Sequence, residues 1–225
     1  MMKTEFSTEI LLDPARSPLF AALLSDVLDG MGHWRQALPA RIRPLDDALL
    51  MIGRARTAAF LEVYGHFEGD NPYELEIALV DGLRPGDIPV FACGTSGRVA
   101  PWGELLSTAA RARGAVGALM DGAVRDVRAI RAMGFPVFHG GIAPLDSKGR
   151  ARVAAIDVPI ECGGVAVSPG DLIVGDADGV VVVPRALEAE ALLRAAAKLV
   201  GERERLRELQ EGQLLAEVFA RHGVL

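Results

Sequence analysis

The chain of 225 residues has little cysteine, few aromatic residues and no long apolar run. Its two cysteines, Cys93 and Cys162, lie far apart, which excludes a disulfide framework and a cysteine-rich zinc site. Aromatic residues make up only 5 % of the chain, which argues against a surface that stacks on nucleic-acid bases. No apolar stretch approaches the roughly 18 residues of a membrane span, so we expect no membrane partner.

Positive charge is also scarce. The chain has 24 Lys and Arg against 30 Asp and Glu, a formal net charge of −6. This balance argues against binding to the phosphate backbone of nucleic acid. The three lysines lie at a terminus, in a glycine-flanked loop and on a charged helix (Lys3, Lys148 and Lys198), which makes a Schiff-base mechanism unattractive. The first residues lack the apolar core of a signal peptide, so we expect a cytoplasmic protein.

Half of the residues are hydrophobic and 24 % are charged, which is typical of a globular protein with a large core. Short apolar runs alternate with helical patterns through the first two thirds, which predicts an α/β fold. The expected helices are 17–30, 71–82, 102–113 and 127–133. The expected strands are 49–61, 88–93, 115–120 and 136–138.

The last third has a different pattern. Val/Ile runs broken by Gly, Pro and Asp predict a β-meander over 152–184. An Ala/Leu/Glu/Arg-rich stretch then predicts a long helix to about Gln210, followed by a short helix that ends at His222. We expect one domain, 1–225, in which residues from about 185 to 225 form a helical arm. The arm can pack on a neighbouring subunit or fold back on its own core, and the sequence favours neither.

The segment that suggests chemistry contains Glu104 and the pair Arg125-Asp126, with 20 residues between them. Glu104 is expected in the first turn of a helix, and the pair is expected just after the next strand, at the sheet edge where α/β proteins bind ligands. The N–H groups of Leu105 and Leu106 and the Arg125 guanidinium would bind an oxo-acid, and the carboxylates would bind Mg²⁺ or Mn²⁺. A purely structural role for these residues is the alternative.

This segment resembles the RraA-like family, and in particular its class II, metal-dependent pyruvate aldolases. The family pattern is an acidic residue, twenty intervening residues and Arg-Asp. Further similar motifs extend the resemblance from about Ser25 to Gly212; they are Ser25–Asp29, Gly53–Thr57, Gly69–Asn71, Asp121–Asp126 and Gly175–Pro184. The resemblance implies a β/β/α sandwich of the swivelling phosphohistidine-like type, assembled as a trimer or a dimer of trimers.

The resemblance also implies roles for single residues. Arg125 would bind the pyruvyl group, Asp126 would ligate Mg²⁺, and Glu104 would act on the metal through water. The backbone that follows Gly103, at Leu105 and Leu106, would hold the pyruvate carboxylate. The family usually has Asp where this chain has the longer Glu104. An acidic residue of the arm would reach a neighbouring subunit's site, and Glu202 is the candidate, although a solvated helix face is the commoner explanation for any single Glu there.

The implied activity is retro-aldol cleavage of a 4-hydroxy-2-oxo dicarboxylic acid, such as 4-hydroxy-4-methyl-2-oxoglutarate, to pyruvate and a second oxo-acid. Decarboxylation of oxaloacetate is expected as well, because both reactions pass through the enolate of pyruvate. The alternative is a protein regulator that binds and inhibits a ribonuclease, as in the family's other branch. We expect those regulators to be shorter and to lack the helical arm, which favours the aldolase.

Overall fold

The centre of the fold is a twisted, mixed eight-stranded sheet in a computed structural model that describes residues 6–65, 69, 71–94 and 96–224. Its strands are β1 (Arg43–Pro44), β2 (Met51–Glu62), β3 (Asp87–Ala92), β4 (Ala118–Met120), β6 (Val137–His139), β8 (Ala151–Ile156), β11 (Leu172–Asp176) and β12 (Gly179–Val183). Their order is β1-β6-β4-β3-β2-β11-β12, and β8 pairs with β2. The neighbours β2, β3, β4 and β6 are parallel, whereas the remaining pairs are antiparallel.

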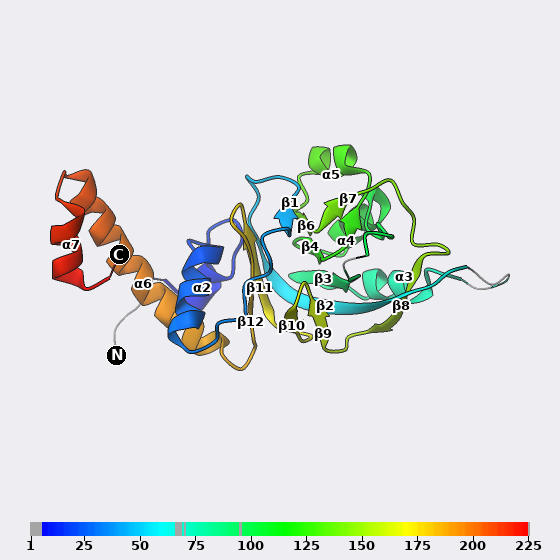
Figure 1. Cartoon of the computed structure of the whole chain (residues 1–225), viewed down its shortest axis with the longest axis horizontal. Helices are drawn as coiled ribbons and strands as arrows, with labels where there is room; N and C mark the ends of the chain where they lie inside the picture. Colours follow the sequence, from blue (N-terminus) through cyan, green and yellow to red (C-terminus); the bar gives the residue numbers. More distant parts are fainter. Residues whose placement is uncertain (1–5, 66–68, 70, 95, 225) are drawn as a thin grey trace.

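Two small pairs of strands and the helices complete the described architecture (Figure 1). The small pairs are β5 (Ala123–Val124) with β7 (Gly141–Ile142), and β9 (Ile160–Cys162) with β10 (Val165–Val167). The helices are α1 (Thr8–Leu11), α2 (Ala21–Gly30), α3 (Glu74–Asp81), α4 (Glu104–Ala112), α5 (Val127–Met133), α6 (Glu188–Gln210) and α7 (Leu215–His222).

The long strand β2 organises the sheet because its two edges have different partners. One edge pairs with β3, whereas the other is divided between β11 at the start and β8 at the end, with a bulge between Ala59 and Phe60. The β-meander expected over 152–184 is therefore wrong. Its strands form β8 on the edge of β2 and two separate hairpins, because the long strand offers more edge than one partner can cover.

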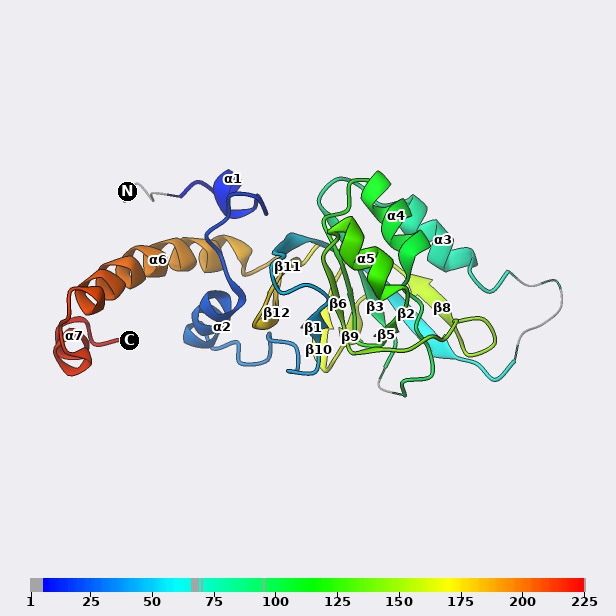
Figure 2. The ribbon, with the colours of Figure 1, turned by 90° about the horizontal axis from the view of Figure 1, so that it is seen from above.

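Each face of the sheet is covered by its own layer. Helices α3, α4 and α5 lie on one face, where Phe91 and Trp102 are fully buried (Figure 2). The opposite face packs against β9 and β10 through residues such as Met51 and Phe138. This arrangement of helices, sheet and strands confirms the expected α/β class and β/β/α sandwich. Burial of these large side chains stabilises the sandwich by about 1.5–3 kcal/mol each.

A third apolar cluster joins α2 and the first half of α6 to the β11–β12 hairpin. The helix expected to begin at Ser17 starts at Ala21 instead. Its first N–H group, that of Ala21, donates to the Oδ2 atom of Asp176 at 2.7 Å, so the cap comes from 155 residues away. Ser17 instead donates its hydroxyl to the carbonyl of Leu11. A local capping pattern could not reveal this long-range partner.

The C-terminal arm is helical, as expected, and its two halves differ. The first half of α6 packs on α2, whereas the second half and α7 extend away from the sheet (Figures 1 and 2). Helix α7 folds back on α6, where Glu208 contacts Arg221 at 3.3 Å and His222 at 3.1 Å. Packing of this arm on a neighbouring subunit stays a prediction. No described helix is long and apolar enough to cross a membrane.

Candidate active site

Trp102 explains how Glu104 and Arg125, with 20 residues between them in the sequence, come together. It forms a β-bridge with Val124, and its carbonyl accepts a hydrogen bond from the Arg125 N–H at 2.9 Å. Its fully buried indole donates to Ser107 at 2.8 Å and meets the ring of Phe91 edge to face, with centroids 5.3 Å apart. The beginning of α4 is thereby held against the end of β5, so that Arg125 lies beside the helix N-terminus.

Asp126 and Gly103 fit together at this point. Asp126 has a left-handed backbone, with φ of 56°, which is uncommon outside glycine and turns its side chain toward α4. Its Oδ2 atom accepts a hydrogen bond from the Glu104 N–H at 3.2 Å. A Cβ atom on Gly103 would lie 2.4 Å from that same oxygen, so only glycine leaves room for the carboxylate.

The guanidinium of Arg125 is loosely held. Its Nη1 atom lies 3.4 Å from Oδ1 of Asp146 and 3.4 Å from the carbonyl oxygen of Leu145, and its Nε atom lies 3.8 Å from Oδ2 of Asp126. The side chain is 36 % exposed. None of these contacts has the short, paired geometry of a bidentate arginine–carboxylate bridge, so the fork keeps donors available for a ligand.

A cavity of about 290 Å³ adjoins these groups. It is lined by Tyr73, Glu76, Ile77, Pro101, Gly103, Leu105, Leu106, Arg125, Asp126 and Asp146. A more open hollow of about 540 Å³ borders Arg125 and Asp126 from the side of α5 and β7. The two residues thus border two spaces, of which the first is partly enclosed and the second is open toward solvent.

The start of α4 offers hydrogen-bond donors to this cavity. Within the described part of the chain, the N–H groups of Leu105 and Leu106 have no hydrogen-bond partner, as expected for the first turn of a helix. These N–H groups and the positive end of the helix dipole favour a carboxylate. The structure therefore brings Gly103, Leu105 and Leu106 to Arg125 and Asp126. Glu104 contributes its backbone N–H group, whereas its side chain is exposed and does not line either cavity.

Three further polar residues line the cavity, although no sequence pattern had selected them; they are Tyr73, Glu76 and Asp146. The hydroxyl of Tyr73 donates to Oδ2 of Asp146 at 2.7 Å. Burial and this bond raise the pKa of Tyr73 to about 12. Burial opposes the charge on Asp146, but the bond from Tyr73 and the charge of Arg125 lower its pKa overall. Burial, together with the charge of Asp146, raises the pKa of Glu76 to about 8, although Arg125 opposes this shift.

One signal could have identified Glu76. It precedes Leu79 and Val80 by three and four positions, so it shares the buried face of α3 with them. A carboxylate in the apolar stripe of a helix is unusual and points to a specific use. No comparable pattern marks Tyr73, which precedes the helix, or Asp146, which lies in a loop after β7.

Other residues singled out in the sequence lie elsewhere. Glu202 is on α6, on the projecting side of the molecule, and its nearest ion-pair partner is Lys198 at 3.8 Å. This chain alone does not bring it to Arg125. Asn71, where the helix 71–82 was expected to begin, accepts a hydrogen bond from the N–H of Tyr73 at 3.1 Å, and α3 begins later, at Glu74. Its neighbour Asp70 lies outside the described residues.

Asp126 and Glu104 are the residues of this segment that could ligate a divalent metal ion. Asp126 and Glu104 supply hard carboxylate oxygens, and the described residues include no cluster of three His, Cys, Asp or Glu side chains. A closed zinc or calcium cage is therefore not built here. Mg²⁺ is commonly bound by one or two carboxylates, with water and substrate as its remaining ligands. The residues present fit a hydrated ion of that kind.

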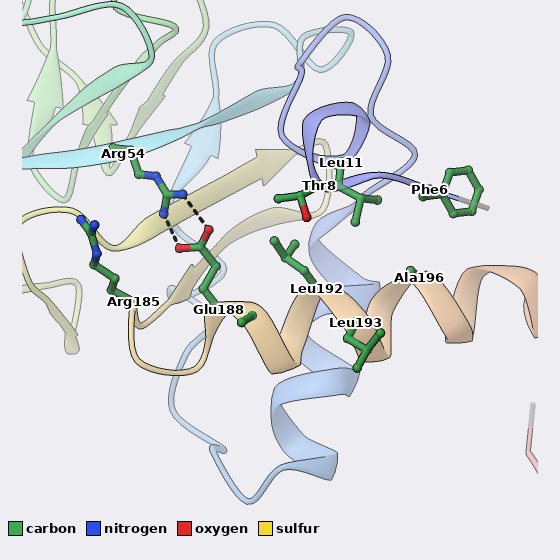
Figure 3. Close-up of a pocket in the computed structure, with 10 residues that line it drawn as sticks. Phe6, Thr8, Leu11, Arg54, Arg185, Glu188, Leu192, Leu193 and Ala196 are labelled. Carbon is green, nitrogen blue, oxygen red and sulfur yellow. Dashed lines mark hydrogen bonds and ion pairs between the residues drawn. The ribbon is translucent and has the colours of Figure 1, made fainter. Parts of the chain in front are cut away.

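A second cavity, of about 500 Å³, lies between α1 and the start of α6 (Figure 3). The guanidinium of Arg54 forms a two-point bridge there with Glu188, of which the Nη2–Oε1 contact is 2.6 Å. This bond to Glu188 raises the pKa of Arg54 further. Apolar residues of α6 such as Leu192 complete the wall. Arg54 and Glu188 satisfy each other, so Arg54 has fewer unused donors than Arg125, although the exposed Arg185 also lines this cavity.

Comparisons with known proteins agree with these observations. A family model described as "RraA-like: Aldolase/RraA" matches residues 21–182. A protein of Halalkalibacterium halodurans, named "Putative 4-hydroxy-4-methyl-2-oxoglutarate aldolase", is 35 % identical over 196 residues, which cover 87 % of each chain.

Solved structures show the same fold. An uncharacterized protein from Pseudomonas syringae pv. tomato has a TM-score of 0.79 and 30 % identity, covering 94 % of this chain and 97 % of its own. RraAS2 of Streptomyces coelicolor, described as an unusual member of the RNase ES inhibitor RraA protein family, has a TM-score of 0.75 and 26 % identity, covering 92 % of this chain and 98 % of its own. The chain belongs to the RraA-like family.

Proposed function

We propose that this protein is a divalent-metal-dependent carbon–carbon lyase that cleaves a 4-hydroxy-2-oxo dicarboxylic acid, such as 4-hydroxy-4-methyl-2-oxoglutarate, to pyruvate and a second oxo-acid. The observation that carries the proposal is the loosely held guanidinium of Arg125 beside the unpaired N–H groups at the start of α4. Together they form a site for an oxo-acid on the edge of a cavity. The similarity to the protein named as an aldolase supports this reading.

The roles of the residues follow from their chemistry. The N–H groups of Leu105 and Leu106 hold the substrate's C1 carboxylate, and the Arg125 fork lies where it can bind the C2 oxygen. In the cleavage step the C4 hydroxyl group loses its proton to a solvent base and becomes a carbonyl. The electron pair of the broken C3–C4 bond then passes to C3 and the C2 oxygen as an enolate. Charge on the C2 oxygen grows in the transition state, so a fixed guanidinium stabilises that state more than the ground state.

Asp126 and Glu104 would hold Mg²⁺ or Mn²⁺ next to Arg125. When bound, the ion supplies a second positive charge for the developing enolate. The hydrogen bond from the Glu104 N–H fixes the Asp126 carboxylate, and Gly103 leaves the space that this carboxylate needs. Glu202 would join such a site only from a neighbouring subunit of a trimer or a dimer of trimers, because in its own chain it lies on the projecting arm.

The test follows pyruvate formation from 4-hydroxy-4-methyl-2-oxoglutarate and from oxaloacetate, with Mg²⁺ or with a chelator. We expect activity with Mg²⁺, its loss with the chelator and its loss in Asp126→Asn. Asp178→Asn, in the exposed β11–β12 turn, is the matched control and should keep full activity. Cleavage that persists in the chelator or in Asp126→Asn would contradict metal dependence, and absence of cleavage in the wild type would contradict the lyase.

A ribonuclease regulator is the second candidate, because the Streptomyces protein is described as a member of an RNase ES inhibitor family. The match covers nearly the whole of both chains. The presence of the helical arm therefore does not separate the two functions as the sequence had suggested. A ribonuclease E-type enzyme can be assayed with and without the purified protein. Inhibition by wild type and Arg125→Ala alike, without oxo-acid cleavage, would favour the regulator.

A further inference from the structure

Glu76 lines the cavity, but the proposed function assigns no role to it. Its side chain lines the same cavity as Arg125 and the start of α4, and the residue is only 4 % exposed. Its Oε2 atom is buried and has no hydrogen-bond partner among the described residues. A buried polar atom without a partner costs about 1–3 kcal/mol, so this carboxyl group lowers stability unless something in the cavity binds it.

The neighbouring polar groups are already engaged. The Tyr73 hydroxyl is donated to Asp146, and Asp146 also contacts the Arg125 guanidinium. Asp126 accepts the N–H of Glu104. Burial beside the negative charge of Asp146 favours the protonated form of Glu76. Glu76 is thus the side chain lining the described cavity that presents an unshared acidic proton.

The proposed reaction needs such a group. After the C3–C4 bond breaks, the electron pair is delocalised over C3 and the C2 oxygen, and C3 must gain a proton before pyruvate leaves. We propose that Glu76 is the acid that protonates C3 of the enolate. The Glu76 O–H bond breaks and a C3–H bond forms, which leaves the Glu76 carboxylate and pyruvate. Solvent then returns a proton to Glu76. This inference rests on the proposed function.

The decisive measurement separates proton transfer from bond cleavage. In D₂O with Mg²⁺, wild-type protein should exchange the methyl protons of pyruvate, which proton NMR follows directly. We expect the exchange rate to fall at least about 100-fold in Glu76→Gln, at the lower end of the range of general acid–base contributions. Release of CO₂ from oxaloacetate should fall much less, because the C–C bond can still break and the enolate can be protonated in solution.

Glu74→Gln is the matched control, because Glu74 lies on the same helix but is exposed. It should keep both rates. Binding of oxalate, a mimic of the enolate, should stay within about threefold in Glu76→Gln, and calorimetry would show that the site is intact. Thermal unfolding in chelator near neutral pH should show Glu76→Gln at least as stable as wild type, because the amide has no proton to release when the chain unfolds.

Each outcome decides a different point. Exchange within twofold of wild type in Glu76→Gln would overturn the role of Glu76 while leaving the lyase standing. Equal loss of exchange and of CO₂ release, with oxalate binding intact, would assign Glu76 to cleavage and also overturn the proposal. A wild type that neither exchanges pyruvate protons nor cleaves an oxo-acid would overturn the proposed function itself, and this inference with it.

Discussion

Arg54 and Arg125 both line cavities, and they differ in how firmly their guanidinium groups are held. Arg54 meets Glu188 through both arms of its fork, with one contact at 2.6 Å (Figure 3). Arg125 makes only contacts of 3.4 Å or longer to Asp146, Leu145 and Asp126. The Arg54 cavity measures about 500 Å³, and the two spaces beside Arg125 measure about 290 Å³ and about 540 Å³. Cavity size therefore does not distinguish the two arginines, whereas the unused donors of Arg125 do.

The largest expected effect comes from removing the loosely held arginine. Arg125→Ala should lower kcat/KM for oxaloacetate by about 10²–10³-fold, because it removes a charge aimed at the developing enolate. Pyruvate formation at saturating Mg²⁺ measures the effect. Stability should change little, since the Arg125 side chain is partly exposed and its ion pairs are long. Arg54→Ala is the matched control, and an equal loss of activity in both variants would erase the contrast between the two cavities.

The next effect tests whether Asp126 must be placed as it is. Gly103→Ala puts a Cβ atom 2.4 Å from Asp126 Oδ2, so the carboxylate must move. We expect activity to fall by about 10–100-fold, because a shift of about 1 Å at a catalytic site has that cost. Gly30→Ala, where an added Cβ meets nothing within 4 Å, is the matched control. Full activity in Gly103→Ala would mean that the position of Asp126 is not critical.

Two parts of the molecule, the segment from Glu104 to Asp126 and the start of α2, differ in how well the sequence predicted them. The Glu104 to Asp126 segment could be predicted, because local patterns place a helix start and a strand end at adjacent points of one sheet edge. In the structure, the β-bridge between Trp102 and Val124 holds these two points together. The cap of α2 by Asp176 could not be predicted, because its two partners are 155 residues apart and no local pattern links them.

The inner wall of the cavity shows the same limit. Tyr73 and Asp146 meet through a hydrogen bond that joins residues 73 positions apart, and neither lies in a recognisable motif. Glu76 could have been identified as a carboxylate on the apolar face of α3. Its position in the same cavity as Arg125 depends on how α3 packs over the sheet, which no local pattern predicts. Long-range packing of this kind is decided by the whole core and not by neighbouring residues.

A smaller effect concerns stability and pH. Glu76 stays protonated in the folded chain up to about pH 8, whereas its unfolded value is 4.5, so the folded state holds the extra proton between these values. Stability from this group is present below pH 4.5 and is lost as pH rises toward 8, by up to about 1.4 kcal/mol per pH unit. Glu76→Gln removes this loss, so its advantage over wild type should grow between pH 5 and pH 8.

Urea unfolding in chelator across this pH range measures the difference. The groups facing Glu76 also titrate or carry charge; they are Tyr73, Cys93, Arg125, Asp126 and Asp146. Glu74→Gln shares all of these groups with wild type, so its curve is the reference and should run parallel to wild type. A difference in free energy of unfolding between Glu76→Gln and wild type that does not change with pH would show that Glu76 ionises normally. Glu76 would then not differ in this respect from Glu188, which is paired with Arg54.

The smallest expected effect lies at the satisfied arginine itself. Arg54→Ala should lower the free energy of unfolding by about 1–2 kcal/mol, because Glu188, whose side chain is 15 % exposed, then loses its charged partner. Glu188→Ala should cost a similar amount, and the double variant should cost less than the sum, since each single change already breaks the bridge. Urea unfolding of the four proteins gives the coupling. The contrary outcome is that the losses in free energy of unfolding of the two single variants add fully and that lyase activity falls. Arg54 would then bind a ligand and not Glu188, and the cavity beside it would be a binding site.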